Sequence, residues 1–593
     1  MRKIALGALL LFIAASFLPF GGNKFDIMSQ ANLLYMVGLL VAIFAAVLLQ
    51  KQSYFRKTPL LIVFFALLLI SLLTSQIHNY GWSETLIWGF AIIIFAVTQT
   101  FSEKEKKFLK IALTTFALIS CAIGFAAYLM RPETRMDGLF FDLSDVRHVW
   151  PNAFALLLLM TWPVAADLTS GKKWWLRVLI LTPIFTALFL TFSRAAMIAF
   201  ALQLIIIFLF RVPRHKSQVT SFFAILLATI LLITSLQYAR NLQFNTNSFQ
   251  KKIAFEGTEK QTSFQERLDF FKGGMKLAWE KPLFGFGPGT FRFVYPSVQP
   301  DFLANSDHPH NIFIKLGMEN GIPASLALLV FFALFTWEFW KKRRTEDAQK
   351  KLLLFAAVLG ALAHNLVDYN LNFLSNITIF WILIALVIPE EPAPLQPKSH
   401  TSQVTRHTFF VVLAIVLTLS VIAEAATSLA FRLTGSLGIM KHAQFPRDFW
   451  ANRGDEKSLQ HHLALNPLDA YAWNNLGKLQ QKNGDKKSAI TSYKNAILTN
   501  PANNFEFYVN YFRLASQLPT QSETQKITDT ALKFLKTYPE KVASNIHYTA
   551  NSGNFQEAIV LAGLLHQDTL AKKIRSAKKT YESQKVDTTA SKE

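Results

Sequence analysis

The stretch "KQSYFRKTPLLIVFFALLLISLLT", residues 51–74, combines the two features that decide the fold. Basic residues gather in its first part, and an uncharged run of Leu, Ile, Phe and Ala follows. An apolar run of about 18 or more residues is long enough to cross a bilayer as a helix. Because such runs recur through the first 430 residues, the sequence predicts an all-α polytopic membrane protein.

The overall composition agrees with this prediction. The chain has 593 residues, of which 52% are hydrophobic, and a mean hydropathy of +0.28. A net charge of +22 would suggest nucleic-acid binding in a soluble domain. Many basic residues lie instead in short loops between apolar runs, including 171–177, 211–216 and 341–351. This is the pattern of cytoplasmic loops, so we predict no nucleic-acid partner.

The apolar runs predict 12 or 13 membrane-spanning helices. The first is counted as a span because no clear signal-peptide cleavage site is visible. The predicted spans are 4–20, 31–50, 58–75, 83–101, 108–130, 150–168, 176–192, 195–211, 218–238, 322–340, 352–368, 372–389 and 408–431.

With the N-terminus inside, the segment between spans nine and ten and the whole C-terminal tail fall outside the membrane. The predicted organisation is an N-terminal bundle (1–238), a large extracytoplasmic loop (239–321), further spans (322–389), a proline-rich cytoplasmic linker (390–406), a last span (407–432), an extracytoplasmic helical-repeat domain (433–570) and a disordered tail (571–593).

One loop conflicts with the rule that basic residues gather in cytoplasmic loops. Residues 131–149 include three arginines but fall outside in this scheme. Either these arginines have an extracytoplasmic partner such as a phosphate, which we favour, or the topology shifts here. The single cysteine, Cys121, lies in an apolar run and excludes an intrachain disulfide and a cysteine-based metal site.

The C-terminal part contains one clear repeat. Residues 470–501 match the 34-residue tetratricopeptide pattern at Trp473, Leu476, Gly477, Ala489, Tyr493, Ala496 and Pro501. Such helix pairs stack into a concave surface that binds protein partners. A spacer or stability module is the alternative interpretation.

Two arginines are candidates for function. Arg194 follows Ser193 in a tight reversal between two apolar runs, where an ionisable group indicates function or snorkels from a helix end. Arg267 lies in 264–279, where helical spacing predicts an amphipathic helix on the outer surface. Its apolar side is predicted to comprise Phe264, Leu268, Phe271, Met275 and Leu277, and its polar side Glu266, Arg267 and Lys272. A merely solvated polar side is the alternative.

The stretch "SDHPHNIFIKLGMENG", residues 306–321, places His308, His310, Asn311 and Glu319 just before a predicted span. Histidine titrates near neutral pH and so suits a general base. The spacing does not match a zinc site, so no metal is predicted; a structural histidine is the other alternative. The glycine-rich "GFGPGTF", residues 285–291, allows close backbone approach or a sharp turn.

A second polar pair occurs further along the chain. His364 and Asp368 are four residues apart, a spacing that predicts one helix face near the outer boundary. They would line the same cavity as His310 or pair with each other.

Together, Ser-Arg at an outer helix junction, a loop ending in G-x-G-x-G-x-F, then H-N followed by E-x-G resemble the O-antigen ligase and polymerase superfamily, which includes lipid-linked protein O-oligosaccharyltransferases. The resemblance covers roughly residues 30–390 and is most specific over 264–323. Some members have similar outward-facing tetratricopeptide repeats. The departures, Ala196, Pro323 and Ala324, lie at packing positions.

The resemblance implies a C-type membrane glycosyltransferase of the bacterial cytoplasmic membrane. It would transfer a glycan from undecaprenyl diphosphate to an acceptor hydroxyl with inversion and without a cofactor. It assigns diphosphate binding to Arg194 and Arg267 and an essential role to His310. The residues His308, Asn311, Glu319, His364 and Asp368 are accessory candidates.

Several functions compete at this stage. The acceptor would be lipid A-core or a growing polysaccharide, with a protein Ser or Thr as the alternative. A lipid-linked glycan transporter would place its polar residues at mid-membrane depth, whereas these candidates gather at the outer boundary. A non-catalytic scaffold would tolerate loss of Arg194, Arg267 and His310.

Overall fold

A computed structural model gives the architecture. It describes residues 2–16, 58–131, 135–141, 149–210, 217–244, 262–301, 306–388, 408–409, 411–419, 451, 453–515, 521–544 and 554–590. Within these ranges the chain is almost entirely helical and contains no β-strand, as the all-α prediction requires. The predicted span 31–50, the linker 390–406 and most of the predicted last span lie outside the described residues.

Where the predicted apolar runs fall on described residues, they coincide with helices to within several residues. Among the described residues, four helices are long and apolar enough to cross a membrane: α6, α7, the Phe223–Phe244 part of α10, and α15. The predicted count of 12 or 13 spans and their orientation remain predictions. The bundle helices are α1 (Arg2–Ser16), α4 (Thr58–Thr74), α5 (Gly81–Gln99), α6 (Glu103–Met130), α7 (Pro151–Leu168), α8 (Trp174–Leu190), α9 (Arg194–Phe210), α10 (Ser217–Phe244), α15 (Ile322–Lys342), α16 (Glu346–Asn365) and α17 (Leu374–Val387).

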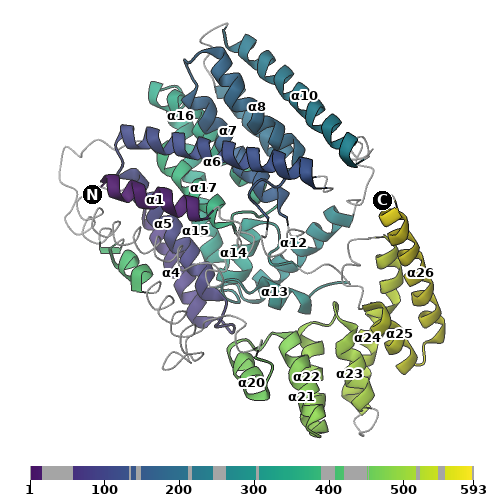
Figure 1. The fold of residues 1–593 in the computed structure, drawn as a ribbon. Helices are drawn as coiled ribbons and strands as arrows, with labels where there is room; N and C mark the ends of the chain where they lie inside the picture. Colours follow the sequence, from purple (N-terminus) through teal and green to yellow (C-terminus); the bar gives the residue numbers. More distant parts are fainter. Residues whose placement is uncertain are drawn as a thin grey trace.

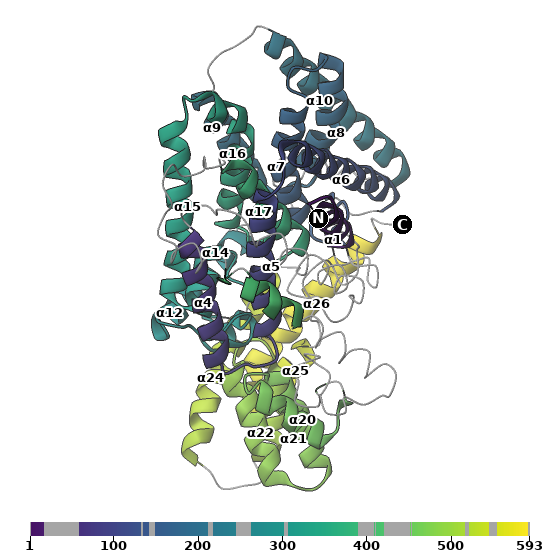
Figure 2. The ribbon, with the colours of Figure 1, turned by 90° about the vertical axis from the view of Figure 1, so that its left-hand side faces the viewer.

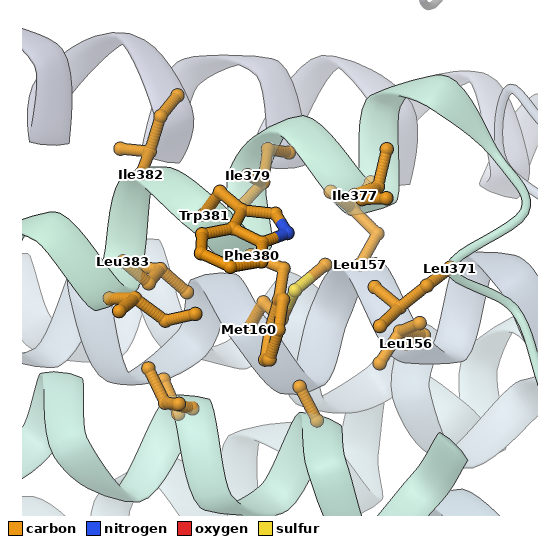
Figure 3. Packing of buried hydrophobic residues seen from close by; sticks show 14 of the residues in the cluster. Leu156, Leu157, Met160, Leu371, Ile377, Ile379, Phe380, Trp381, Ile382 and Leu383 are labelled. Atoms are coloured by element: carbon orange, nitrogen blue, oxygen red, sulfur yellow. The ribbon is translucent and has the colours of Figure 1, made fainter. Parts of the chain in front are cut away.

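Helix α17 forms the centre of the bundle. All of its residues are buried, because it packs on α5, α7 and α16. Figure 3 shows Trp381 and Phe380 of α17 above Leu157 and Met160 of α7. A helix that is apolar on every side belongs in a protein core or in a bilayer; α17 lies in the core, and the neighbouring helices pack around it.

Short elements cover one end of the bundle, where α16 ends and α7, α9, α15 and α17 begin (Figures 1 and 2). We call this the site end. The covering elements are α12 (Thr262–Glu280), α13 (Phe291–Val294), η3 (Tyr295–Ser297) and α14 (Ile312–Asn320).

A buried carboxylate holds the glycine-rich loop against α14. Gly285, Gly287 and Gly289 all have positive φ, a conformation that glycine adopts at no steric cost. Glu319, fully buried, accepts hydrogen bonds from the backbone N–H of Gly289 at 3.0 Å and of Phe291 at 3.2 Å. The loop therefore turns sharply and returns to the bundle.

Lys315 neutralises this carboxylate. Its ammonium group bonds Glu319 and, at 2.8 Å, Glu84 of α5. Burial would lower the pKa of Lys315, but the Glu319 and Glu84 carboxylates raise it above the ordinary lysine value. Glu319 was predicted as an accessory site residue; in the structure it is the partner of the glycine-rich loop and of Lys315.

The C-terminal helices form a curved row beside the site end (Figure 1). The predicted repeat corresponds to α21 and α22, and Gly477 lies so close to the Tyr493 ring that a Cβ would come within 2.6 Å of it. The helix pair is therefore present, whereas its assignment as a tetratricopeptide repeat remains a prediction. The helices are α20 (Glu456–Leu465), α21 (Ala470–Lys482), α22 (Lys486–Thr499), α23 (Phe505–Ala515), α24 (Gln521–Ser544), α25 (Asn554–Leu564) and α26 (Asp568–Ala590).

Helix α26 corrects the prediction of a disordered tail at 571–593. The structure is helical through residue 590. Ala571 and Ile574 are buried in the C-terminal hydrophobic core, and α26 packs on α24 and α25. The low hydrophobicity of the tail concealed this narrow apolar face.

Polar contacts join the C-terminal helices to the site end. The side-chain amides of Gln299 and Asn503 donate to each other, at 2.7 and 3.0 Å, in a buried environment. The hydroxyl of Thr537 donates to Asp301 at 2.6 Å. The C-terminal helices are thus attached to the chain at Gln299 and Asp301, about ten residues before His310.

Loss of one member of the Gln299–Asn503 pair is expected to destabilise the protein. Asn503→Ala leaves the buried side-chain oxygen of Gln299 without the donor at 3.0 Å, at a cost of about 1–3 kcal/mol, and lowers the midpoint of thermal unfolding in detergent. The double variant Gln299→Leu/Asn503→Leu removes both amides and is expected to lose less than the two single changes combined. Simple additivity of the two losses would contradict this pairing.

Candidate active site

Asp368 is the centre of the candidate site. It lies in the turn between α16 and α17 and is 3% exposed. Its carboxylate oxygens lie 2.8 Å from Nδ1 of His310, 3.7 Å from Nη2 of Arg267 and 2.5 Å from Nδ2 of Asn152. These partners come from the loop before α14, from α12 and from the start of α7, so one carboxylate connects four parts of the chain.

The protonation state of Asp368 follows from these partners. Burial would raise the pKa of this carboxyl, but the hydrogen bond with His310 and the nearby charges, including that of Arg267, hold it well below the usual aspartate value. A buried carboxylate with charged and hydrogen-bonding partners stays ionised. Asp368 therefore acts as a fixed negative charge beneath His310.

The prediction that His364 and Asp368 lie on one helix is wrong only in where the helix ends. Helix α16 ends at Asn365, and the backbone N–H of Asp368 donates to the carbonyl of His364 at 2.8 Å. Asp368 therefore lies just beyond the helix, one hydrogen-bonded turn after His364. The imidazole of His364 is fully buried, and its nitrogens have no hydrogen-bond partner among the described residues.

His310 is held in an unusual backbone conformation. Its φ is 56°, in the left-handed region that is uncommon for residues other than glycine. The backbone N–H of His310 donates to Nδ1 of His308 at 3.2 Å. The next residue, Asn311, caps α14 through Oδ1 and donates from Nδ2 to the carbonyl of Leu366 at 2.8 Å. His308 and Asn311 therefore position His310 over the turn that contains Asp368.

Aromatic packing fixes the plane of the His310 ring. Phe270 of α12 stacks on it with ring centroids 5.6 Å apart, and Tyr295 packs edge-on against Phe270 at 5.2 Å. Gly273 allows this arrangement, because a Cβ there would lie 2.4 Å from the Tyr295 ring. Close approach of α12 to η3 therefore requires glycine at this position.

The geometry determines which nitrogen of a neutral His310 is basic. Asp368 accepts from Nδ1, so the proton resides on Nδ1 and the lone pair on Nε2. Nε2 lies 3.4 Å from the hydroxyl of Ser306, and the His310 side chain is 22% exposed. Nε2 is thus arranged to accept a proton from an incoming group.

A second polar chain connects Asp368 to the start of α9. Asn152 accepts from Nη2 of Arg135, whose Nε donates to the carbonyl of Thr191 at 2.9 Å. Thr191 lies in the tight turn before the exposed Arg194. Sequence reasoning missed Arg135 and Asn152, although the excess arginine in 131–149 was an indication.

The structure brings some predicted residues together and separates others. His310 and Arg267 both contact Asp368, and His308 and Asn311 position His310. The polar chain through Asn152 and Arg135 reaches Thr191, three residues before Arg194. Glu319 serves the glycine-rich loop. No group of three His, Cys, Asp or Glu side chains suited to a metal ion occurs among the residues described.

The amphipathic helix predicted at 264–279 corresponds to α12, but its apolar side was partly misassigned. Leu277 is buried as predicted, whereas Met275 is 47% exposed. Arg267, predicted on the polar side, contacts the buried Asp368, which argues against a merely solvated face.

Comparison with known families supports an enzymatic role. Residues 178–329 match the family model described as O-antigen ligase. The matched region includes Arg194, Arg267 and His310, and covers about a quarter of the chain. It supports an O-antigen ligase-like membrane glycosyltransferase. No curated protein and no solved structure matches the chain significantly.

The packing of α12 predicts opposite outcomes for two glycine substitutions. Gly273→Ala forces a methyl group into the Tyr295 ring, and overpacking of this kind costs about 1–3 kcal/mol, so the midpoint of thermal unfolding should fall. Gly563→Ala in α25 is the control: a Cβ added there would meet no atom within 4 Å, and it should stabilise by up to about 1 kcal/mol. Equal effects of the two changes would contradict the close contact.

Proposed function

We propose that the chain is an inverting glycosyltransferase of the O-antigen ligase kind, which transfers a glycan from undecaprenyl diphosphate to an acceptor hydroxyl. The observation that supports this most is the His310–Asp368 pair beside Arg267 at the end of an apolar helix bundle. A base and a cation next to a membrane surface suit a donor whose diphosphate is held at that surface by its lipid.

Arg267 has the chemistry that a diphosphate requires. Its Nη2 faces Asp368, while its Nε is buried and has no hydrogen-bond partner among the described residues. A guanidinium group binds phosphate oxygens through paired N–H donors and stays charged. As the bond to the diphosphate breaks, negative charge develops on the leaving oxygen, and Arg267 together with Arg194 would stabilise it.

His310 would act as the general base. Nε2 accepts the proton of the acceptor hydroxyl while the hydroxyl oxygen attacks the anomeric carbon of the donor glycan. The bond between that carbon and the diphosphate oxygen breaks, undecaprenyl diphosphate leaves, and the configuration inverts. Asp368 stabilises the imidazolium that forms, and the proton then passes to solvent. One displacement thus completes the reaction.

The acceptor is proposed as lipid A-core or a growing polysaccharide. A protein Ser or Thr is the alternative, since the C-terminal helices are attached next to the site through Gln299 and Asn503 and suit a protein partner. We further propose that the site end faces away from the cytoplasm, in the bacterial inner membrane. Transfer by the purified chain to a panel of the three acceptor classes distinguishes them.

The decisive variants exploit backbone conformation. His310 and His566 both have positive φ, 56° and 54°, which asparagine tolerates better than most residues. His310→Asn therefore removes the imidazole and keeps the fold. We expect transfer from an undecaprenyl-diphosphate glycan to fall by about 10²–10⁴-fold, whereas His566→Asn, on the exposed surface of the C-terminal part, retains full activity.

The same assay tests the competing functions. Full activity of a folded His310→Asn protein would reject His310 as the base. Failure of the wild-type chain to transfer glycan to any acceptor, combined with movement of the lipid-linked glycan across vesicles, would reject the transferase in favour of a transporter.

A further inference from the structure

Helix α12 has an apolar strip on its exposed surface that the site does not use. Met275 is 47% exposed, Trp279 is 74% exposed, and Leu283, just after the helix, is 63% exposed. Soluble surfaces rarely expose large side chains in such a series. We call these three residues the α12 strip.

The strip lies next to the functional side of the helix. At about 100° per residue, Trp279 is about 40° around the axis from Met275, and Arg267 is about 80° away in the other direction. Arg267 points to Asp368, and Lys272 and Lys276 are exposed beyond Trp279. Around its axis, helix α12 thus presents first the site arginine, then the apolar strip and then a basic edge.

The strip joins a membrane-spanning helix. The backbone N–H of Ile322, the first residue of α15, donates to the carbonyl of Pro282 at 2.8 Å, next to Leu283. Helix α15 has the length and apolarity of a membrane span and exposes Leu326, Leu329 and Val330. The apolar surface of α15 therefore extends onto the α12 strip at the site end.

We propose that the α12 strip is inserted in the lipid surface next to α15 and sets the depth of Arg267 relative to the lipid headgroups. Tryptophan favours the boundary between headgroups and acyl chains, and lysines at the edge of such a helix bind anionic headgroups. Resting on the proposed function, the same contact places Arg267 at the level of the donor's diphosphate. The partner is a lipid bilayer and not a second copy of the chain.

Cysteine labelling tests insertion without turnover. Cys121, the one cysteine of the chain, is buried, so Cys121→Ala provides a background for Trp279→Cys and Leu283→Cys. Glu280→Cys, exposed one residue further around the helix, is the matched control. Each full-length protein is labelled with an environment-sensitive fluorophore and reconstituted in vesicles of phosphatidylethanolamine and phosphatidylglycerol.

Insertion predicts a blue shift for labels at 279 and 283, loss of their emission with nitroxide-bearing lipid, and protection from aqueous iodide. The label at 280 should show no blue shift, keep its emission with nitroxide-bearing lipid and be quenched by aqueous iodide. Iodide quenching of all three labels would overturn the proposal. So would pyrene excimers from Trp279→Cys that persist at low protein density in the vesicles, because they would identify a second copy of the chain as the occupant.

A kinetic measurement tests the link to Arg267. Trp279→Glu should raise the KM for the lipid-linked donor and leave kcat nearly unchanged, since the altered residue does not contact the reacting groups. An unchanged KM would reject the link. If the labels at 279 and 283 insert but the wild-type chain shows no transferase activity, the proposed function is rejected and the membrane contact stands.

Discussion

The buried negative charge of Asp368 is the constraint on which the site depends. A carboxylate removed from water is costly unless it has charged and hydrogen-bonding partners. His310, Arg267 and Asn152 provide these partners from segments that lie far apart in the sequence. The requirement to compensate one charge therefore brings α7, α12, the loop before α14 and the turn after α16 to a single point.

A second compensated charge supports the first. Glu319 and Lys315 fix the glycine-rich loop and tie α14 to α5 through Glu84. This arrangement holds the backbone next to His310 in place, since α14 begins immediately after Asn311. The C-terminal helices add a further attachment through Gln299. Two buried ionic clusters thus have different roles: one holds the scaffold, and the other forms the candidate site.

Sequence reasoning predicted the helices well because their length and apolarity are local properties. It singled out His310 and Arg267, which the structure brings to Asp368, because ionisable residues beside spans are conspicuous. It missed Asn152 and Arg135, whose roles depend on contacts with residues far along the chain, such as the Asn152–Asp368 pair. It could not predict the contacts of Glu319 with the glycine-rich loop, because spacing alone cannot show that the Gly289 and Phe291 amides would face its carboxylate. The α26 helix was missed because its buried face is narrow.

The central claim is that Asp368 holds the proton of neutral His310 on Nδ1 and leaves Nε2 basic. Nitrogen-15 NMR of histidine-labelled protein tests this directly, with the His310 signals assigned by their loss in His310→Asn. At a pH at which the spectra show the imidazole to be neutral, the account predicts a protonated Nδ1 and an unprotonated Nε2, and a mixture of tautomers in Asp368→Asn. A proton on Nε2 in the wild-type protein would contradict it.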